Sequence, residues 1–139
     1  MRHLLLPATA LLLALAAGCS DEGSSPTNPG GGDSPPATVS YATDIQPIWD
    51  RACTGCHGQN GNGGLDLRAP GSRDRLVDVT AQNYSPAIRV VPGDPDNSVL
   101  YDKLTGGGRF GGAMPPGGLL PAADRELVRR WIADGAPDD

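Results

Sequence analysis

The sequence is short of aromatic side chains and of apolar runs long enough to cross a membrane. Phe, Trp and Tyr make up only 4% of its 139 residues, whereas glycine and proline contribute 20 and 14 residues. A domain so poor in large side chains cannot fill a core by itself, so we expect another apolar body inside it. The apolar stretch from Leu4 to Ala17 is shorter than the ~20 residues that a membrane-spanning helix needs.

Positive charge and histidine are also scarce. The chain has 11 basic and 16 acidic side chains, and removing residues 1–18 takes away Arg2 and leaves 10 basic against 16 acidic. This balance excludes nucleic acid as a partner, whereas a basic docking surface on a partner protein is compatible with it. His3 and His57 are the only histidines, so histidine chemistry in the folded part depends on His57.

What the chain does have is the pentapeptide Cys53-Thr54-Gly55-Cys56-His57. Cys-x-x-Cys-His is the attachment pattern of a c-type haem. In a helical turn, residues three apart lie on the same side, so both sulfurs reach the two vinyl groups at one porphyrin edge. The thioether bonds hold the haem permanently, and His57 then lies under the ring as the proximal iron ligand.

Two other chemistries use similar residues. A zinc site needs about four ligands, and Cys53, Cys56 and His57 have no fourth partner, since Cys19 and His3 belong to the export region. A dithiol redox site usually accompanies a βαβ pattern, and no such alternation is visible. Covalent haem is therefore the favoured interpretation.

The N-terminus predicts an exported lipoprotein. Residues 1–18 have a short basic start, an apolar stretch and small residues directly before Cys19, which resembles the lipobox of bacterial lipoproteins. The alternative is an ordinary cleaved signal followed by a stray cysteine. Lipidation of Cys19 attaches several acyl chains, and more than one chain gives stable anchoring. Residues 19–40, dominated by Ser, Gly, Pro, Asn and Asp, are predicted to be a lipidated, disordered tether.

The folded domain is predicted to occupy residues 41–139. An apolar stripe at helical spacing leads into the haem motif, and the helix begins either at a capping box of Thr43 and Gln46 or with Gln46 as cap and Pro47 first. Asp96 or Asn97 is expected to cap a short helix, and a last helix is expected from Pro121 to Asp134, with Trp131 packing against the first. The stripe consists of Ile45, Ile48, Trp49, Ala52, Cys53 and Cys56.

Met114 is the only methionine outside the signal, and it follows a glycine-rich stretch. A thioether sulfur commonly lies opposite the histidine in electron-transfer haems. Pro115 and Pro116 stiffen the chain after Met114 and so can hold a weak ligand in place. The alternative is a methionine that only fills the core. We expect Met114 to be the distal ligand.

These motifs, in this order, resemble class I cytochromes c and more closely the planctomycete-type cytochrome c domains, over about residues 41–137. The resemblance implies an all-α cytochrome c fold, with N- and C-terminal helices packed over a covalently bound haem, long Gly/Pro-rich loops, and His57 and Met114 as axial ligands. The matching segments are Ile45-Gln46-Pro47-Ile48, Cys53-Thr54-Gly55-Cys56-His57-Gly58, Gly64-Leu65-Asp66-Leu67, Val91-Pro92-Gly93-Asp94-Pro95, Ser98-Val99-Leu100-Tyr101, Met114-Pro115-Pro116 and Trp131-Ile132-Ala133-Asp134-Gly135-Ala136-Pro137.

With both axial positions filled by protein, the iron can only transfer electrons, so the sequence predicts an electron carrier with one haem c, not an enzyme. The alternatives are a peroxidase-like haem enzyme and a gas-sensing module, both with a displaceable Met114. We expect unidentified redox protein partners and a lipid-anchored position facing the periplasm or cell surface, with Ser20 after Cys19 pointing to the outer membrane. Possible contacts of the haem propionates are Arg89, Tyr101, Arg109 and Trp49.

Overall fold

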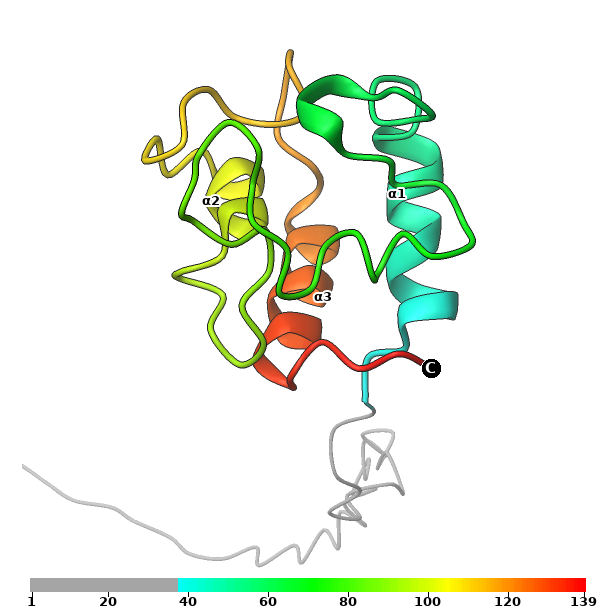
Figure 1. Ribbon diagram of the computed structural model, residues 1–139. Helices are drawn as coiled ribbons and strands as arrows, with labels where there is room; N and C mark the ends of the chain where they lie inside the picture. The colour runs from blue at the N-terminus through cyan, green and yellow to red at the C-terminus, as the bar shows by residue number, and fades with distance from the viewer. Residues whose placement is uncertain (1–37) are drawn as a thin grey trace, which may run out of the picture. The chain divides into compact units, whose positions relative to one another are not determined.

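The structure, a computed structural model, describes residues 38–139, and its regular elements are all helical (Figure 1). They are the π-helix η1 (Tyr41–Ile45), α1 (Gln46–Ala52), the 3-10 turn η2 (Asn62–Gly64), α2 (Val99–Thr105) and α3 (Ala122–Ala133). This part of the chain has only isolated β-bridges and no strand, which confirms the predicted all-α class. None of its helices is long and apolar enough to cross a membrane. The predicted signal peptide, Cys19 and the tether up to residue 37 lie outside the described residues.

The first helix begins earlier than expected. Neither Thr43 nor Gln46 caps it; the cap is Ser40, whose Oγ accepts the N–H of Thr43 at 3.3 Å. η1 continues directly into α1, and the N–H of Gln46 donates to the carbonyl of Tyr41, five residues back. Pro47 lies in the first turn of α1, as predicted. Val39 is only 3% exposed and belongs to the core, so the packed part of the chain includes residues before Tyr41.

The first and last helices pack together through aromatic side chains. The rings of Tyr41 and Trp131 are 5.1 Å apart, which confirms the predicted contact of Trp131 with the N-terminal helix. On the surface, Arg51 and Asp124 form an ion pair of 2.6 Å between α1 and α3. The end of the chain returns to the start of η1 (Figure 1), where Asp139 accepts the N–H of Tyr41 on Oδ1 at 2.7 Å.

The other two helices also begin differently from the prediction. α2 is capped by Ser98 rather than by Asp96 or Asn97. Ser98 is completely buried, and its Oγ accepts the N–H of Val91 at 2.9 Å while donating to the carbonyl of Asp94 at 2.8 Å. The side chain therefore closes the preceding turn instead of bonding to the helix. Pro121 is the cap of α3 and not its first residue.

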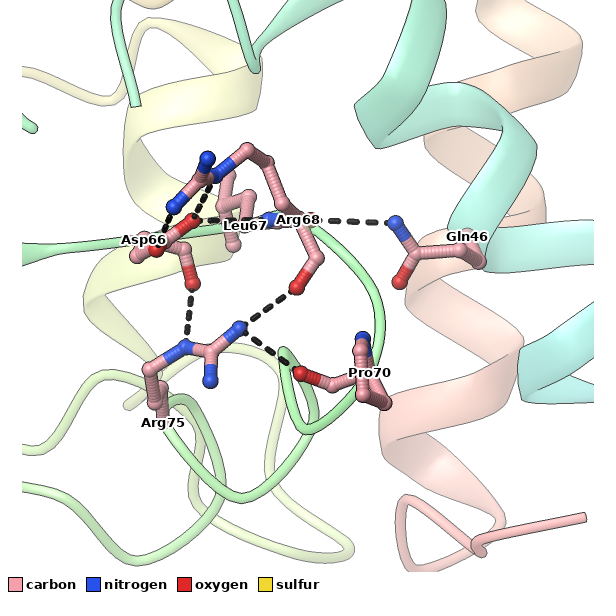
Figure 2. Close-up of polar contacts among 6 residues, drawn as sticks. All are labelled: Gln46, Asp66, Leu67, Arg68, Pro70 and Arg75. Atoms are coloured by element: carbon pink, nitrogen blue, oxygen red, sulfur yellow. Dashed lines mark hydrogen bonds and ion pairs between the residues drawn. The ribbon is translucent and has the colours of Figure 1, made fainter. Parts of the chain in front are cut away.

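A long irregular segment between η2 and α2 is held by arginines that donate to backbone carbonyls (Figure 2). Arg75 donates from Nε to the carbonyl of Asp66 at 2.6 Å and from Nη2 to that of Pro70 at 3.2 Å. Arg68 donates to the carboxylate of Asp66 at 2.8 Å, and this hydrogen bond holds the pKa of Asp66 well below its usual range. The segment has a fixed shape without regular secondary structure.

A buried chain of hydrogen bonds fastens α1 to this segment. The Trp49 Nε1–H donates to the Tyr41 hydroxyl at 3.2 Å, and that hydroxyl lies 2.7 Å from Ser72 Oγ. Because Ser72 donates to Gln46 Oε1, Tyr41 must be the donor to Ser72. Gln46 donates in turn to the carbonyl of Leu67 at 3.0 Å (Figure 2). Burial raises the pKa of Tyr41, so its hydroxyl stays protonated and the direction of the chain is fixed.

Replacing Tyr41 with Phe should lower the free energy of unfolding by about 1–3 kcal/mol, because the Trp49 N–H and the Ser72 hydroxyl lose a buried partner. The measurement is a denaturant titration of the purified full-length protein. Tyr84→Phe is the matched control, since the Tyr84 ring packs on Phe110 at 5.5 Å and its hydroxyl is not part of this buried chain. Equal stability of the two variants would mean that the buried chain contributes nothing.

Candidate functional site

The helices and the irregular segment surround a cavity of about 170 Å³. Its walls come from α1, from residues around η2, from residues 81–84 and from α2. Most of the surface that lines it is apolar and is supplied by Trp49, Leu65, Leu67, Leu76, Ala81, Val99, Leu100 and Leu104. The packed core continues behind this wall, because Trp49, Leu67, Leu76 and Leu104 are at most 2% exposed. The predicted space for an apolar body is therefore present.

The haem motif forms a tight turn directly after α1, at the edge of this cavity. The N–H groups of Cys56 and His57 both donate to the carbonyl of Cys53, at 3.0 and 2.8 Å. The carbonyl of His57 accepts the N–H of Leu67 at 2.8 Å, which ties the turn to the opposite wall. Cys53 and His57 line the cavity, while Cys56 is exposed and lies outside its lining.

The histidine is poised for a partner that the protein does not supply. The Nδ1 atom of His57 is buried and makes no hydrogen bond to any described residue. Buried polar atoms are nearly always paired, so an unpaired imidazole nitrogen points to a ligand. Within residues 38–139, no three side chains of His, Cys, Asp or Glu gather in a cluster that could hold a bare metal ion.

The two cysteines differ in their surroundings. Burial raises the pKa of the Cys53 thiol to about 11, whereas Cys56 is exposed. Cys53 is therefore a neutral thiol near neutral pH, packed beside the cavity wall. Neither cysteine forms a disulfide within the described residues.

Met114 lines the same cavity as His57. It is half-buried, and its N–H donates to the carbonyl of Lys103 in α2 at 2.8 Å. The structure therefore brings together the residues predicted to hold iron, His57 from the turn after α1 and Met114 from the segment after α2. It does so through one backbone hydrogen bond that the sequence alone did not reveal.

The charged groups of the cavity are all positive. Arg89 and Lys103 line it, and no carboxylate of residues 38–139 does. Arg89 donates to the carbonyls of Arg75 at 2.7 Å and Gly64 at 3.0 Å, and burial lowers its pKa. Lys103 donates to the carbonyl of Gly112 at 3.1 Å and lies 4.9 Å from the ring centre of Tyr84. Among the described residues, neither cation has an ion-pair partner, so the cavity fits an apolar group that carries negative charge.

The four residues predicted to contact propionates differ in whether they line the cavity and in which partners they already have. Arg89 lies at the cavity with an uncompensated charge. Trp49 lines the cavity, but its N–H already donates to Tyr41. Tyr101 and Arg109 do not line the cavity: Tyr101 lies near Arg129 of α3, and Arg109 donates to the carbonyl of Asp96 at 2.7 Å on the surface. For Trp49, Tyr101 and Arg109 the geometry does not favour the role.

Sequence reasoning missed several lining residues. Lys103 shares a helical face with Val99 and Leu100, at the spacing that identifies such a face, so the pattern of α2 could have revealed it. The other missed residues come from the short turn η2 and from the irregular segment after it, where no extended periodicity exists to place a side chain. They are Asn62, Gln82, Asn83 and Tyr84.

Residues 53–118 match the sequence model of the family described as Planctomycete cytochrome C. The chain contains a cytochrome c-type domain. Such a domain implies covalently bound haem c, and Cys53 and Cys56 both lie within the matched residues. The cavity fits this cofactor: it is mostly apolar, its charged lining residues among those described are Arg89 and Lys103, and it is lined by Cys53 and by His57, whose buried Nδ1 is unpaired.

Comparison with other proteins adds little to the cytochrome c match. Among solved structures, a chain of Kuenenia stuttgartiensis hydrazine synthase resembles this one with a TM-score of 0.47 and 23% identity. The aligned region covers 73% of this chain and 16% of that chain, and the likeness carries no conclusion about activity. No curated protein matches the sequence.

Replacing Gly61 with Ala should destabilise the haem turn of this cytochrome c domain. An added Cβ would lie 2.8 Å from the Cα of His57 and from the carbonyl oxygen of Gly58, and would collide with the carbonyl oxygen of Leu65. Such overpacking costs about 1–3 kcal/mol, to be measured as the free energy of unfolding. In Gly112→Ala, the control, the added Cβ meets no atom within 4 Å. A Gly61 variant as stable as this control would show that the turn accommodates the added Cβ without loss of free energy of unfolding.

Proposed function

We propose that this chain is a lipid-anchored electron-transfer cytochrome c that carries one haem c, attached through Cys53 and Cys56 and ligated by His57 and Met114. The observation that carries the proposal is that Cys53, His57 and Met114 line one mostly apolar cavity, whose charged lining residues, among those that the structure describes, are the cations Arg89 and Lys103. Bound haem supplies an iron that gains or loses one electron. The side chains of the protein would ligate the iron, exclude water and balance the charge of the haem.

The proposed role of His57 and Met114 is to occupy both axial positions, which leaves no place for a substrate. His57 is the only histidine in the described residues, so no second imidazole is available there to move protons. The apolar wall formed by Leu67, Leu76 and Leu104 keeps water away from the ring, which raises the reduction potential. These features favour a carrier over a peroxidase or a gas sensor.

Arg89 and Lys103 are proposed to face the two carboxylates of the haem. Each cation lines the cavity without an ion-pair partner among the described residues, and each is held by donation to backbone carbonyls. An acidic group brought beside Arg89 would offset the cost of burying this guanidinium, which now lowers its pKa. The cofactor would thus supply the charges that the protein lacks at this site.

Export and membrane attachment complete the proposal. Lipidation of Cys19, followed by a Ser/Gly/Pro-rich tether, would keep the domain at a membrane that faces the periplasm or cell surface, and Ser20 favours the outer membrane. Residues 38–139 carry 13 acidic side chains against 10 basic ones, and this acidic domain suits redox proteins with a basic docking surface. The donor and acceptor would be separate proteins.

The primary test uses full-length protein from a host that attaches haem to exported proteins. We expect one covalent haem by pyridine haemochrome assay and by mass, a weak sulfur-to-iron charge-transfer band in the ferric state, and a ferrous state that is indifferent to carbon monoxide. Met114→Ala should abolish the band, open the iron to carbon monoxide and lower the potential. Cys53→Ala/Cys56→Ala is the control that lacks haem. Colourless wild-type protein would overturn the proposal, and rapid carbon monoxide binding by the wild type would favour the sensor or enzyme.

A second prediction concerns the cavity cations. Arg89→Gln or Lys103→Gln should lower the reduction potential by tens of millivolts, because removal of a positive charge beside the ring favours ferric over ferrous iron. The measurement is a redox titration of each haem-loaded variant. Arg129→Gln is the matched control, since Arg129 lies outside the cavity lining and pairs with Glu126 of α3. A drop in the control as large as that in the two cavity variants would contradict the assignment.

A further inference from the structure

We propose that Asp102 is the positioning residue for Met114: its buried carboxylate folds residues 106–114 into the shape that holds the Met114 sulfur at the cavity. The inference rests on the proposed function, in which that sulfur ligates iron. It adds a residue that neither the haem motif nor the methionine pattern identifies.

The segment between α2 and Met114 has little of its own to fix its shape. Five of its residues are glycines, and Gly106, Gly108 and Gly111 have positive φ values of 71°, 82° and 82°. Glycine-rich backbone loses more conformational freedom on folding than any other. Phe110 is its only large apolar side chain. Specific contacts from outside must therefore hold the segment.

Asp102 supplies those contacts at the middle of the segment. Its side chain is only 8% exposed, and Oδ2 accepts the N–H of Phe110 at 3.2 Å. Oδ1 lies 3.7 Å from Nε of Arg109. The main-chain carbonyl of Asp102 accepts the N–H of Gly107 at 3.0 Å. A Cβ on Gly107 would collide with Oδ1 of Asp102, so backbone and carboxylate are packed against each other.

The neighbouring residue, Lys103, holds the far end of the same segment. Its carbonyl accepts the N–H of Met114 at 2.8 Å, and its Nζ donates to the carbonyl of Gly112 at 3.1 Å. The ring of Phe110 meets Tyr84 at 5.5 Å, and Tyr84 lines the cavity. Asp102 and Lys103 of α2 thus form hydrogen bonds with both ends and the middle of the segment. The contact with the middle is made by the Asp102 carboxylate.

Loss of this carboxylate should raise the fraction of molecules in which the sulfur is away from the cavity, and a ligand for the open iron binds in proportion to that fraction. Asp102→Asn keeps one acceptor for the Phe110 N–H but loses the charge beside Arg109, whereas Asp102→Ala loses both. A graded response is therefore expected, with the Asn variant between the wild type and the Ala variant.

The experiment uses haem-loaded, full-length protein well below its melting temperature. The readouts are the sulfur-to-iron band of the ferric state and the rate at which the ferrous state binds carbon monoxide. We expect Asp102→Ala to weaken the band and to bind carbon monoxide about tenfold faster or more, and Asp102→Asn to show a smaller change. Asp124→Ala is the matched control, because it removes a carboxylate whose ion-pair partner is Arg51 of α1 and not a residue of this segment.

Gly107→Ala tests the same contact from the other side and remains informative if the Asp102 variants do not load haem. It should accelerate carbon monoxide binding, while Gly112→Ala, which has open space for a Cβ, should not. A wild type with the sulfur band, together with Asp102 and Gly107 variants that keep it and stay slow toward carbon monoxide, overturns the positioning role. A wild type that itself lacks the band overturns the proposed function instead.

Discussion

Apolar side chains surround a cavity that they do not fill. Most of the structure depends on keeping these side chains away from water. Trp49, Leu67, Leu76 and Leu104 are buried on one side by the core and border the cavity on the other. At about 25 cal/mol per Å² of buried apolar surface, a porphyrin in contact with this wall would be one of the largest contributors to folding. The scarcity of aromatic residues agrees with this, because the cofactor supplies the large flat group that the chain lacks.

Much of the site could be predicted because its residues occur in regular patterns. The stripe that includes Ile45, Ile48 and Trp49 follows the helical period, and these side chains are buried as expected. The tight turn of the haem motif and the presence of His57 and Met114 at one cavity follow from residue types with specific chemistry. The contact of Trp131 with the first helix could be predicted because Trp131 lies on the apolar face of the last helix, and the structure buries it against Tyr41.

The helix starts could not be predicted, because capping depends on what else a side chain contacts. Ser40 caps the first helix where the chain returns from its far end, and Ser98 is buried in a turn that begins at Val91. The irregular segment between η2 and α2 is likewise shaped by contacts between residues distant in sequence, such as that of Arg89 with Gly64. A periodic pattern contains no information about such contacts.

The bonds made by Arg75 and Arg89 have a further consequence for how the chain tolerates change. Both guanidinium groups donate to main-chain oxygens, Arg75 to those of Asp66 and Pro70, and Arg89 to those of Arg75 and Gly64. Every amino acid has the same main-chain carbonyl. The residues that accept these hydrogen bonds can therefore be substituted without loss of the bonds. The arginines themselves cannot be substituted in this way. A lysine ammonium group is a compact point charge, whereas the planar guanidinium group donates to two or three carbonyls at once. Homologues should therefore vary in the residues that accept these hydrogen bonds and keep Arg75 and Arg89.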